Sequence, residues 1–322
     1  MIYDDIKNFN EQFGYAPMIE NESALVRKTR VIVAGMGGSE LAAMLMKYSY
    51  PEIDFVIHRN YDLPRLGDEK LADSLVIAIS YSGNTEETID AFNTALQKKI
   101  PLAVITTGGT LLSLAQQNGI PYIQMPSTGM QPRMALGFST IALLKMLGKK
   151  DVIAEIGALV SDLRPSEYEE AGKQLAQSLN HKIPLIYVSK HDEAIAYVWK
   201  IKFNETGKIP AFYNVFPELN HNEMAGFDGQ GAAKDLSGNF ACILLDDTKD
   251  DPRIIKRINM LEQLYQKRGI AVHRATLRGD SRLFRIFSSI VLADWTSYYI
   301  AQMYGSEAEQ VPMIEEFKKL IA

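Results

Sequence analysis

Short apolar runs alternate with helical patterns along the first half of the chain. The run Leu75–Ile79 predicts a buried parallel strand, and after it Thr88, Ile89, Phe92 and Leu96 recur at roughly helical spacing. Further strands are predicted at Arg30–Gly35, Asp54–Asn60, Leu102–Thr107 and Tyr122–Met125, and helices at Glu86–Lys98 and Leu111–Asn118. Strands that alternate with helices in this way indicate a parallel, doubly wound sheet.

The second half repeats this alternation after the polar residues 149–151. Its predicted strands are Ile183–Lys190, Ala211–Phe216, Phe240–Asp247 and Ala271–Leu277, and its predicted helices include Ala194–Lys202 and Pro252–Arg268. The final segment, Pro312–Ala322, has the pattern of a short amphipathic helix. The 322 residues suffice for two domains with a core each. We therefore expect an α/β protein with two parallel sheets flanked by helices, over residues 1–150 and 151–322.

Composition and charge narrow the class of protein. Apolar residues make up 47% of the chain and charged residues 23%, which is typical of a soluble globular protein. The formal net charge of −5 and the lack of a Lys/Arg-rich run argue against a nucleic-acid partner. No apolar stretch reaches the ~18 residues that span a membrane, and the acidic N-terminus is unlike a secretory signal. The single cysteine, Cys242, lies in an apolar run. We expect a cytoplasmic protein without a membrane partner.

A loop crowded with hydroxyl groups follows the apolar run at 75–79. Ser80, Ser82 and Thr85 lie where the predicted strand ends and the next helix begins. A helix N-terminus presents free backbone N–H groups and favours an anion, and open α/β sheets bind ligands at this edge. The loop therefore suits a phosphate. An alternative is purely structural: Asn84 caps the helix and Glu87 completes a capping box.

A glycine-rich turn, residues 35–39, follows the predicted strand 30–35, earlier in the chain than the serine-rich loop. It resembles a dinucleotide fingerprint, but Glu40 occupies the position of the third glycine. The next strand ends in residues 58–60, His-Arg-Asn, where that fingerprint expects an acidic residue for the ribose. Gly37 and Gly38 still allow backbone N–H groups to approach an anion, and Ser39 adds a hydroxyl. We expect two loops that converge on one phosphate, and no nucleotide cofactor.

Two candidate acid–base residues lie in the second half. Glu205 and His221 are separated by a predicted strand and lie among Asn, Gly and Pro, in segments too polar and irregular for a core. A buried Glu can act as a carbon-acid base, and His moves protons between oxygens near neutral pH. A metal site at His221–Glu223 or His191–Glu193 is the alternative, but neither segment has a common metal-binding spacing. We expect no metal.

Together these segments resemble the bifunctional phosphoglucose/phosphomannose isomerases of the sugar isomerase (SIS) domain superfamily. The resemblance runs along nearly the whole chain and rests on residues 35–42, 80–88, 131–137, 202–211, 217–223 and 311–319. The two N-terminal loops occur across SIS proteins generally and imply a sugar phosphate. The last three segments, which carry Asn-Glu-x-x-Lys, Pro-Glu-x-x-His-Asn-Glu and a terminal lysine, point to this subgroup.

The resemblance implies a fold, an assembly and an activity. Each subunit would contain two SIS subdomains, and a homodimer would form active sites at the subunit interface. The enzyme would interconvert glucose 6-phosphate, and mannose 6-phosphate, with fructose 6-phosphate through a cis-enediolate, without metal or cofactor. The substrate phosphate would be held by Gly37, Gly38, Ser39, Ser80, Ser82 and Thr85.

The same resemblance assigns roles to the catalytic residues. Glu205 would be the base that moves a proton between C2 and C1. Arg133 would stabilise the negative charge of the enediolate. His221 and Lys318 would open the sugar ring, although Lys319 is adjacent and a shift of one residue would exchange the two lysines. These roles form a coherent metal-free mechanism: a base shuttles the proton, a cation stabilises the enediolate, and an acid–base pair acts at the ring oxygen.

Two other functions share this fold. Aminosugar-phosphate synthases need an ammonia-producing domain with a nucleophilic N-terminal cysteine, and this chain has Met1 and one internal cysteine. An aminosugar-phosphate isomerase stays open. Sugar-phosphate sensors that control transcription carry a helix-turn-helix domain, whereas about 29 residues precede the first predicted strand here. The preference for glucose or mannose 6-phosphate is also open, since both pass through one enediolate.

Overall fold

The chain folds into two compact units, residues 8–162 and residues 1–7 together with 163–322. The computed structural model describes residues 2–229, 231 and 233–321. We call the first the N-terminal unit and the second the C-terminal unit.

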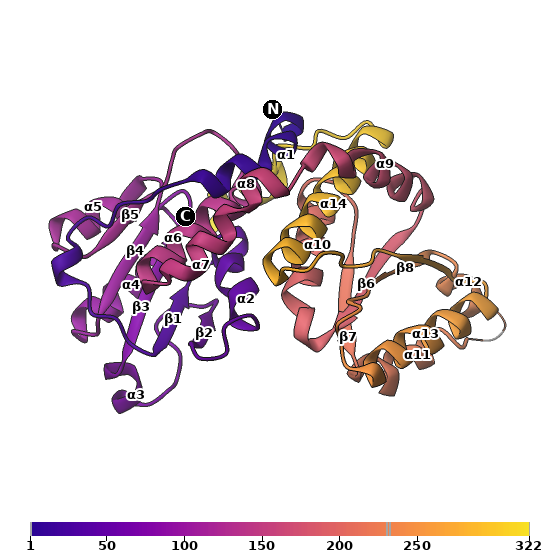
Figure 1. Cartoon of the computed structure of the whole chain (residues 1–322), viewed down its shortest axis with the longest axis horizontal. Helices are drawn as coiled ribbons and strands as arrows, with labels where there is room; N and C mark the ends of the chain where they lie inside the picture. The colour runs from indigo at the N-terminus through magenta and orange to yellow at the C-terminus, as the bar shows by residue number, and fades with distance from the viewer. Residues whose placement is uncertain (1, 230, 232, 322) are drawn as a thin grey trace. The chain divides into compact units, whose positions relative to one another are not determined.

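The N-terminal unit contains a parallel sheet whose described strands lie in the order β2-β1-β3-β4-β5 (Figure 1). The strands are β1 (Arg30–Ala34), β2 (Asp54–His58), β3 (Ser74–Ser80), β4 (Leu102–Thr106) and β5 (Tyr122–Gln124). The helices are α2 (Leu41–Lys47), α3 (Asp68–Ala72), α4 (Glu86–Gln97), α5 (Gly109–Gln117), α6 (Leu136–Leu147), α7 (Lys150–Gly157) and α8 (Leu159–Asp162). The strand order reverses between β1 and β3, which makes the carboxyl ends of these two strands the switch point where such sheets bind ligands.

Apolar side chains bury both faces of this sheet. Val76 and Val104 on one face pack with Phe92 of α4 and Leu111 of α5. Helices α2 and α6 contact the sheet and each other. β3 is buried at every position, as its unbroken apolar run predicts for a central parallel strand.

The C-terminal unit contains a second parallel sheet, in the order β7-β6-β8-β9 among the described residues. The strands are β6 (Ile183–Ser189), β7 (Phe212–Phe216), β8 (Phe240–Leu245) and β9 (Ala271–Arg274). The helices are α1 (Ile2–Lys7), α9 (Glu169–Ser178), α10 (Glu193–Glu205), α11 (Glu223–Gly226), α12 (Ala233–Ser237), α13 (Pro252–Lys267), α14 (Arg282–Met303) and α15 (Pro312–Ile321). α13 packs on one face, where Leu261 meets Tyr187 and Cys242. α10 contacts β6 and packs against α14.

The predicted α/β class with two parallel sheets flanked by helices is confirmed. The element boundaries differ in places. α10 continues to Glu205, three residues beyond the predicted helix, because Lys202 and Phe203 are buried and hold the last turn in the core. The predicted strand Phe240–Asp247 ends at Leu245, because Asp246 and Asp247 turn into ion pairs with arginines. No helix in the described part of the chain is both long and apolar enough to cross a membrane.

Candidate active site

The serine loop, residues 80–85, connects the carboxyl end of β3 to α4. Ser80 is fully buried, and its Oγ lies 2.9 Å from Thr85 Oγ1. Ser82 Oγ accepts a hydrogen bond from Asn84 N at 3.3 Å. The loop thus gathers the three predicted hydroxyl groups in one turn. A hydroxyl that accepts a backbone N–H keeps its own hydrogen to donate to an anion.

The glycine loop, residues 35–39, lies directly against the serine loop. Tyr81 N donates a hydrogen bond to Ser39 Oγ at 3.1 Å, and Ser39 is 7% exposed. Gly37 has φ +57°, a left-handed conformation that favours glycine, and opens the 3-10 turn η3 (Gly37–Glu40). Because β1 and β3 are paired neighbours, the two loops flank the switch point of the sheet.

A third segment, the 3-10 turn η4 (Pro132–Met134), packs against the glycine loop. A Cβ atom added to Gly38 would lie 3.1 Å from both Arg133 N and Pro132 C. A side chain at position 38 would therefore press against the backbone of this turn, so the two backbones lie close together. Arg133 is 1% exposed. The structure thus brings the predicted residues of the glycine loop, the serine loop and Arg133 into one region of the N-terminal unit.

Asn84 does not cap α4, contrary to the structural alternative considered for this loop. The N-cap of α4 is Thr85, where no side-chain capping bond forms in the described structure. Asn84 Oδ1 instead accepts hydrogen bonds from Thr110 N and Thr110 Oγ1, both at 3.0 Å. Asn84 therefore binds the N-terminus of α5, on the loop that follows β4. The sequence offered a local cap as one of two interpretations, because nothing in it connects position 84 with position 110.

Gly83 lets the serine loop pack on the loop after β4. Its φ is +72°, and a Cβ atom at this position would lie 1.8 Å from Gly108 O. Gly83 N donates to Ser80 Oγ at 3.0 Å, and Gly83 O accepts from Leu111 N at 2.9 Å. Like the contact at Gly38, this contact depends on a glycine. The sequence did not predict it, because there Gly83 is simply part of a turn.

Glu40 occupies the place where a dinucleotide fingerprint needs its third glycine. Its side chain is fully buried, and Arg59 Nε donates to Glu40 Oε2 at 2.5 Å. Burial raises the pKa of Glu40, whereas the hydrogen bond and charge of Arg59 lower it. Arg59 follows β2, where that fingerprint has its acidic residue. The position of the third glycine therefore holds a buried carboxylate paired with an arginine.

Glu205 is the last residue of α10, so the prediction that it lies on an irregular connecting segment was wrong. It is half-buried, and Lys208 Nζ donates to its backbone carbonyl at 2.6 Å. One turn earlier, Lys202 Nζ lies 2.6 Å from Asp294 Oδ1 of α14, and both side chains are 0% exposed. This buried ion pair fixes the end of α10, and thereby the backbone of Glu205, against α14.

His221 ends the 3-10 turn η7 (Glu218–His221), which follows β7. Its side chain is exposed, and its imidazole forms no hydrogen bond or ion pair with any residue that the structure describes. Residues on both sides of His221 are anchored: Leu219, within the turn, is fully buried, and Glu223 is hydrogen-bonded to the sheet. The histidine is therefore presented on a fixed segment of the C-terminal unit.

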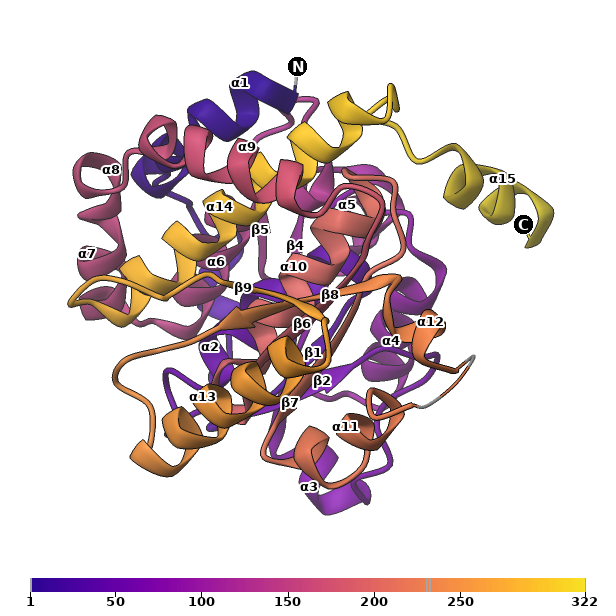
Figure 2. The same ribbon diagram turned by 90° about the vertical axis from the view of Figure 1, so that its right-hand side faces the viewer.

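Lys318 lies on α15, none of whose described residues is buried. Lys318 Nζ forms an exposed ion pair with Glu315 Oε1 at 2.7 Å. The apolar side chains of this helix are exposed, Met313 at 81% and Leu320 at 77%. Figure 2 shows α15 standing apart from α10 and α11. The structure therefore does not bring Lys318 together with Glu205 and His221.

Known protein families match both units of the chain. Residues 24–147 match the SIS domain family, and residues 168–321 match the family described as bacterial phospho-glucose isomerase C-terminal SIS domain. A bifunctional phosphoglucose/phosphomannose isomerase from Caldicellulosiruptor bescii is 36% identical, over 100% of this chain and 99% of that protein. The chain belongs to the bifunctional phosphoglucose/phosphomannose isomerase family. The resemblance that the sequence motifs indicated is thereby confirmed.

A second relative supports this membership, and a solved structure shares the fold. A relative of the same name from Aquifex aeolicus is 31% identical, over 99% of this chain and 97% of that protein. Among solved structures, glucosamine-6-phosphate deaminase from Thermotoga maritima matches with a TM-score of 0.70 and 14% identity, over 97% of this chain and 96% of that chain. The structural match shows that the fold is shared. Proteins of this family are isomerases, so the chain is an enzyme of that class.

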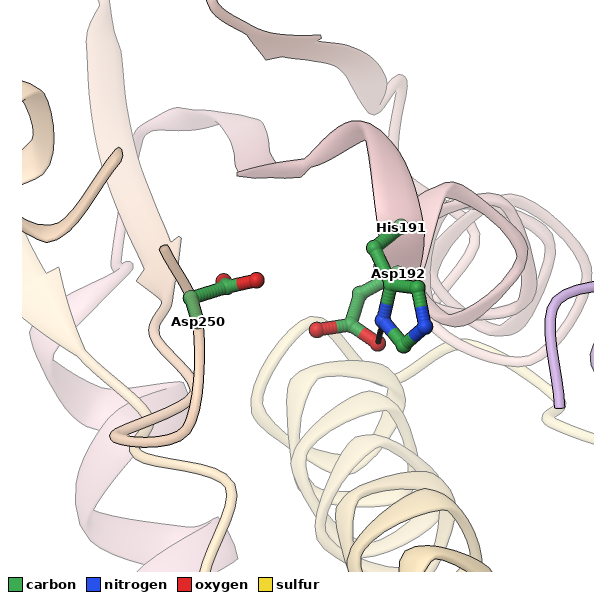
Figure 3. Close-up of side chains that lie close together, drawn as sticks. All are labelled: His191, Asp192 and Asp250. Atoms are coloured by element: carbon green, nitrogen blue, oxygen red, sulfur yellow. Dashed lines mark ion pairs between the residues drawn. The ribbon is translucent and has the colours of Figure 1, made fainter. Parts of the chain in front are cut away.

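His191, Asp192 and Asp250 could hold a metal ion by geometry. Their ligand atoms lie within 4.8 Å of one another (Figure 3), at the carboxyl ends of β6 and β8. Asp192 is 1% exposed, and Arg282 Nη1 lies 2.5 Å from its Oδ1. Arg282 thus pairs with Asp192, and Arg285 pairs with the neighbouring Asp247. The C-terminal sheet thus carries an acidic, arginine-paired cluster where the N-terminal sheet carries hydroxyl groups.

Proposed function

We propose that this enzyme interconverts fructose 6-phosphate with glucose 6-phosphate, and with mannose 6-phosphate, without a metal. The observation that carries the proposal is the arrangement at the switch point of the N-terminal sheet. There Ser39 and Ser82 each accept a backbone N–H, so their hydroxyl hydrogens remain for an anion, and Ser80 Oγ and Thr85 Oγ1 share a hydrogen bond beside them. A sugar phosphate offers terminal oxygens that take such donors. Family membership supplies the reaction class.

The catalytic roles follow the family resemblance. Glu205 removes the proton from C2 of the aldose and returns it to C1, which converts the aldehyde and hydroxyl groups through a cis-enediolate. Arg133 stabilises the negative charge on the enediolate oxygen. His221 and Lys318 transfer protons at O1 and O5 while the C1–O5 bond breaks, which opens the ring.

Incubation with fructose 6-phosphate tests the reaction directly. We expect NMR spectra to show glucose 6-phosphate and mannose 6-phosphate appearing at rates that EDTA leaves unchanged. Activity that disappears on chelation and returns with zinc would contradict the metal-free mechanism. Turnover of glucosamine 6-phosphate, with none of fructose 6-phosphate, would replace the proposal with an aminosugar-phosphate reaction.

Replacing Ser82 and Thr85 by alanine should chiefly raise KM for fructose 6-phosphate. Each lost hydrogen bond to the charged phosphate should cost about 1.5–3 kcal/mol, or roughly tenfold or more in affinity. Steady-state kinetics of the two single variants and the double variant measure this. Ser113→Ala is the control, because Ser113 lies on α5 and bonds only weakly to Gly109 O at 3.4 Å. An unchanged KM in a folded double variant would place the phosphate elsewhere.

Gly83→Ala should displace the serine loop, because its new Cβ would meet Gly108 O at 1.8 Å in an unfavourable backbone conformation. We expect KM for fructose 6-phosphate to rise by about tenfold or more, with a lower melting temperature. Gly108→Ala is the matched control, since no heavy atom lies within 4 Å of a Cβ there and its φ of 171° is open to any residue. Equal kinetics for the two variants would show that the contact does not position the loop.

We also propose that the enzyme works in the cytoplasm as a homodimer with shared active sites, in which His221 serves the site whose Glu205 belongs to the other subunit. Mixing inactive Glu205→Gln and His221→Ala proteins under conditions of subunit exchange tests this arrangement. One site of each heterodimer would then carry both defects and the other none. Activity should recover to roughly a quarter of wild type in an equal, random mixture. No recovery after exchange is demonstrated by mass labelling would show that the two residues come from one subunit.

A further inference from the structure

Glu223 links the segment that carries His221 to two strands of the C-terminal sheet. One carboxylate oxygen accepts a hydrogen bond from the Tyr187 hydroxyl of β6, and the other accepts one from Asn214 Nδ2 of β7. Tyr187 and Asn214 are partners in the β6–β7 register. Both oxygens of Glu223 are thus bound at adjacent positions of neighbouring strands, which fixes the start of α11 over the sheet.

A carboxylate at position 223 satisfies both donors at once. Tyr187 is fully buried, and burial, reinforced by the charge of Glu223, raises its pKa, so the hydroxyl stays protonated and donates. The Asn214 side-chain nitrogen can only donate. An ionised Glu offers acceptors to both, whereas Gln would turn its own N–H₂ group toward one of them. A side chain of the same size and polarity as Glu, such as Gln, therefore does not satisfy both donors at this position.

The segment between the sheet and Glu223 has little freedom of its own. Leu219 is buried in the core on one side of His221. On the other side, Asn222 Oδ1 accepts from Glu223 N at 2.6 Å, and Asn222 Nδ2 donates to Glu218 Oε1 at 2.8 Å. The His221 imidazole has no hydrogen-bond or ionic partner within the described residues, so only the backbone of this turn sets its location.

We propose that Glu223 is a positioning residue that holds His221 for opening of the sugar ring. The inference rests on the proposed function, in which His221 exchanges a proton with O1 or O5 as the C1–O5 bond breaks and the O5–H and C1 aldehyde form. Glu223 touches neither the substrate nor Glu205 in this account. Its loss therefore impairs ring opening and leaves proton transfer between C2 and C1 intact.

Two reactions of glucose 6-phosphate separate these steps. Exchange between its α and β anomers needs ring opening only, and two-dimensional exchange NMR measures its rate above the uncatalysed background. Isomerisation needs ring opening and the C2 proton transfer. We expect Glu223→Gln to lower both rates by about tenfold or more, because a buried donor is left unpaired. His221→Ala should act in the same way, whereas Glu205→Gln should lose isomerisation and retain anomer exchange.

Two further variants distinguish positioning from general damage. Glu262→Gln removes a carboxylate bonded to Arg274, in the same unit but outside the His221 segment, and should change neither rate. Adding Tyr187→Phe to Glu223→Gln removes the donor that faces the new amide, so part of the lost rate should return. Hydrogen exchange of the backbone amides at 218–226, followed by mass spectrometry, should be faster in Glu223→Gln and slower again in the double variant.

Each outcome decides a separate point. Slower isomerisation with normal anomer exchange in Glu223→Gln would overturn the inference and assign Glu223 to the C2 proton transfer. Unchanged amide exchange at 218–226 would overturn it as well, because the segment would not depend on Glu223. A wild-type protein that accelerates neither reaction would refute the proposed function, and faster amide exchange in Glu223→Gln would then still establish the anchor.

Discussion

Glu205→Gln should lower kcat for the isomerisation of fructose 6-phosphate by about 10²- to 10⁴-fold, the range that a positioned general base contributes. KM should change little, because the amide keeps the shape of the carboxylate and loses only its basicity. In D₂O the wild type should exchange a C1 hydrogen of fructose 6-phosphate with solvent, and NMR should show that this exchange stops in the variant.

A control on the same helix isolates the effect. Glu193 is the first residue of α10 and pairs with Lys190 at 2.5 Å, so Glu193→Gln changes one carboxylate of the helix far from its end. Its kcat should stay within about twofold of wild type, as for an ordinary surface ion pair. Persistent C1 exchange in Glu205→Gln would mean that another group is the base.

Asp294→Ala should destabilise the C-terminal unit by about 3–5 kcal/mol, because it leaves the buried Lys202 ammonium without its carboxylate. The two charged atoms lie 2.6 Å apart and both side chains are 0% exposed. Replacing both partners, as in Lys202→Met with Asp294→Leu, should restore most of that stability, since two apolar side chains need no counter-charge. Trp199 and Trp295, both in this unit, report its unfolding in urea by fluorescence.

The exposed pair of Lys318 and Glu315 provides the comparison. Its atoms are nearly as close, 2.7 Å, but the side chains are more than half exposed. Glu315→Ala should therefore change the free energy of unfolding by less than about 1 kcal/mol. If Asp294→Ala proved as mild, the Lys202 ammonium would have to be solvated or neutral in the folded protein.

Local patterns were sufficient to predict most of the fold. Continuous apolar runs, as at 75–79, marked strands buried on both faces, and helical spacing marked the helices between them. Errors arose where long-range packing moved a boundary, as at the end of α10. The catalytic roles of Glu205, His221, Lys318 and Arg133 came from the family resemblance and stay predictions.

By itself the sequence determined which residues stand at the carboxyl ends of strands, because hydrophobic periodicity is local to each segment. It therefore placed Ser39 and the serine loop at one edge of a sheet. Only the tertiary structure decided their partners: Asn84 with Thr110, Glu40 with Arg59, and Lys202 with Asp294. The physical reason is that each of these bonds joins two segments that are distant in the sequence. Whether the segments meet depends on strand order and helix packing, and the two bonded residues by themselves do not reveal either.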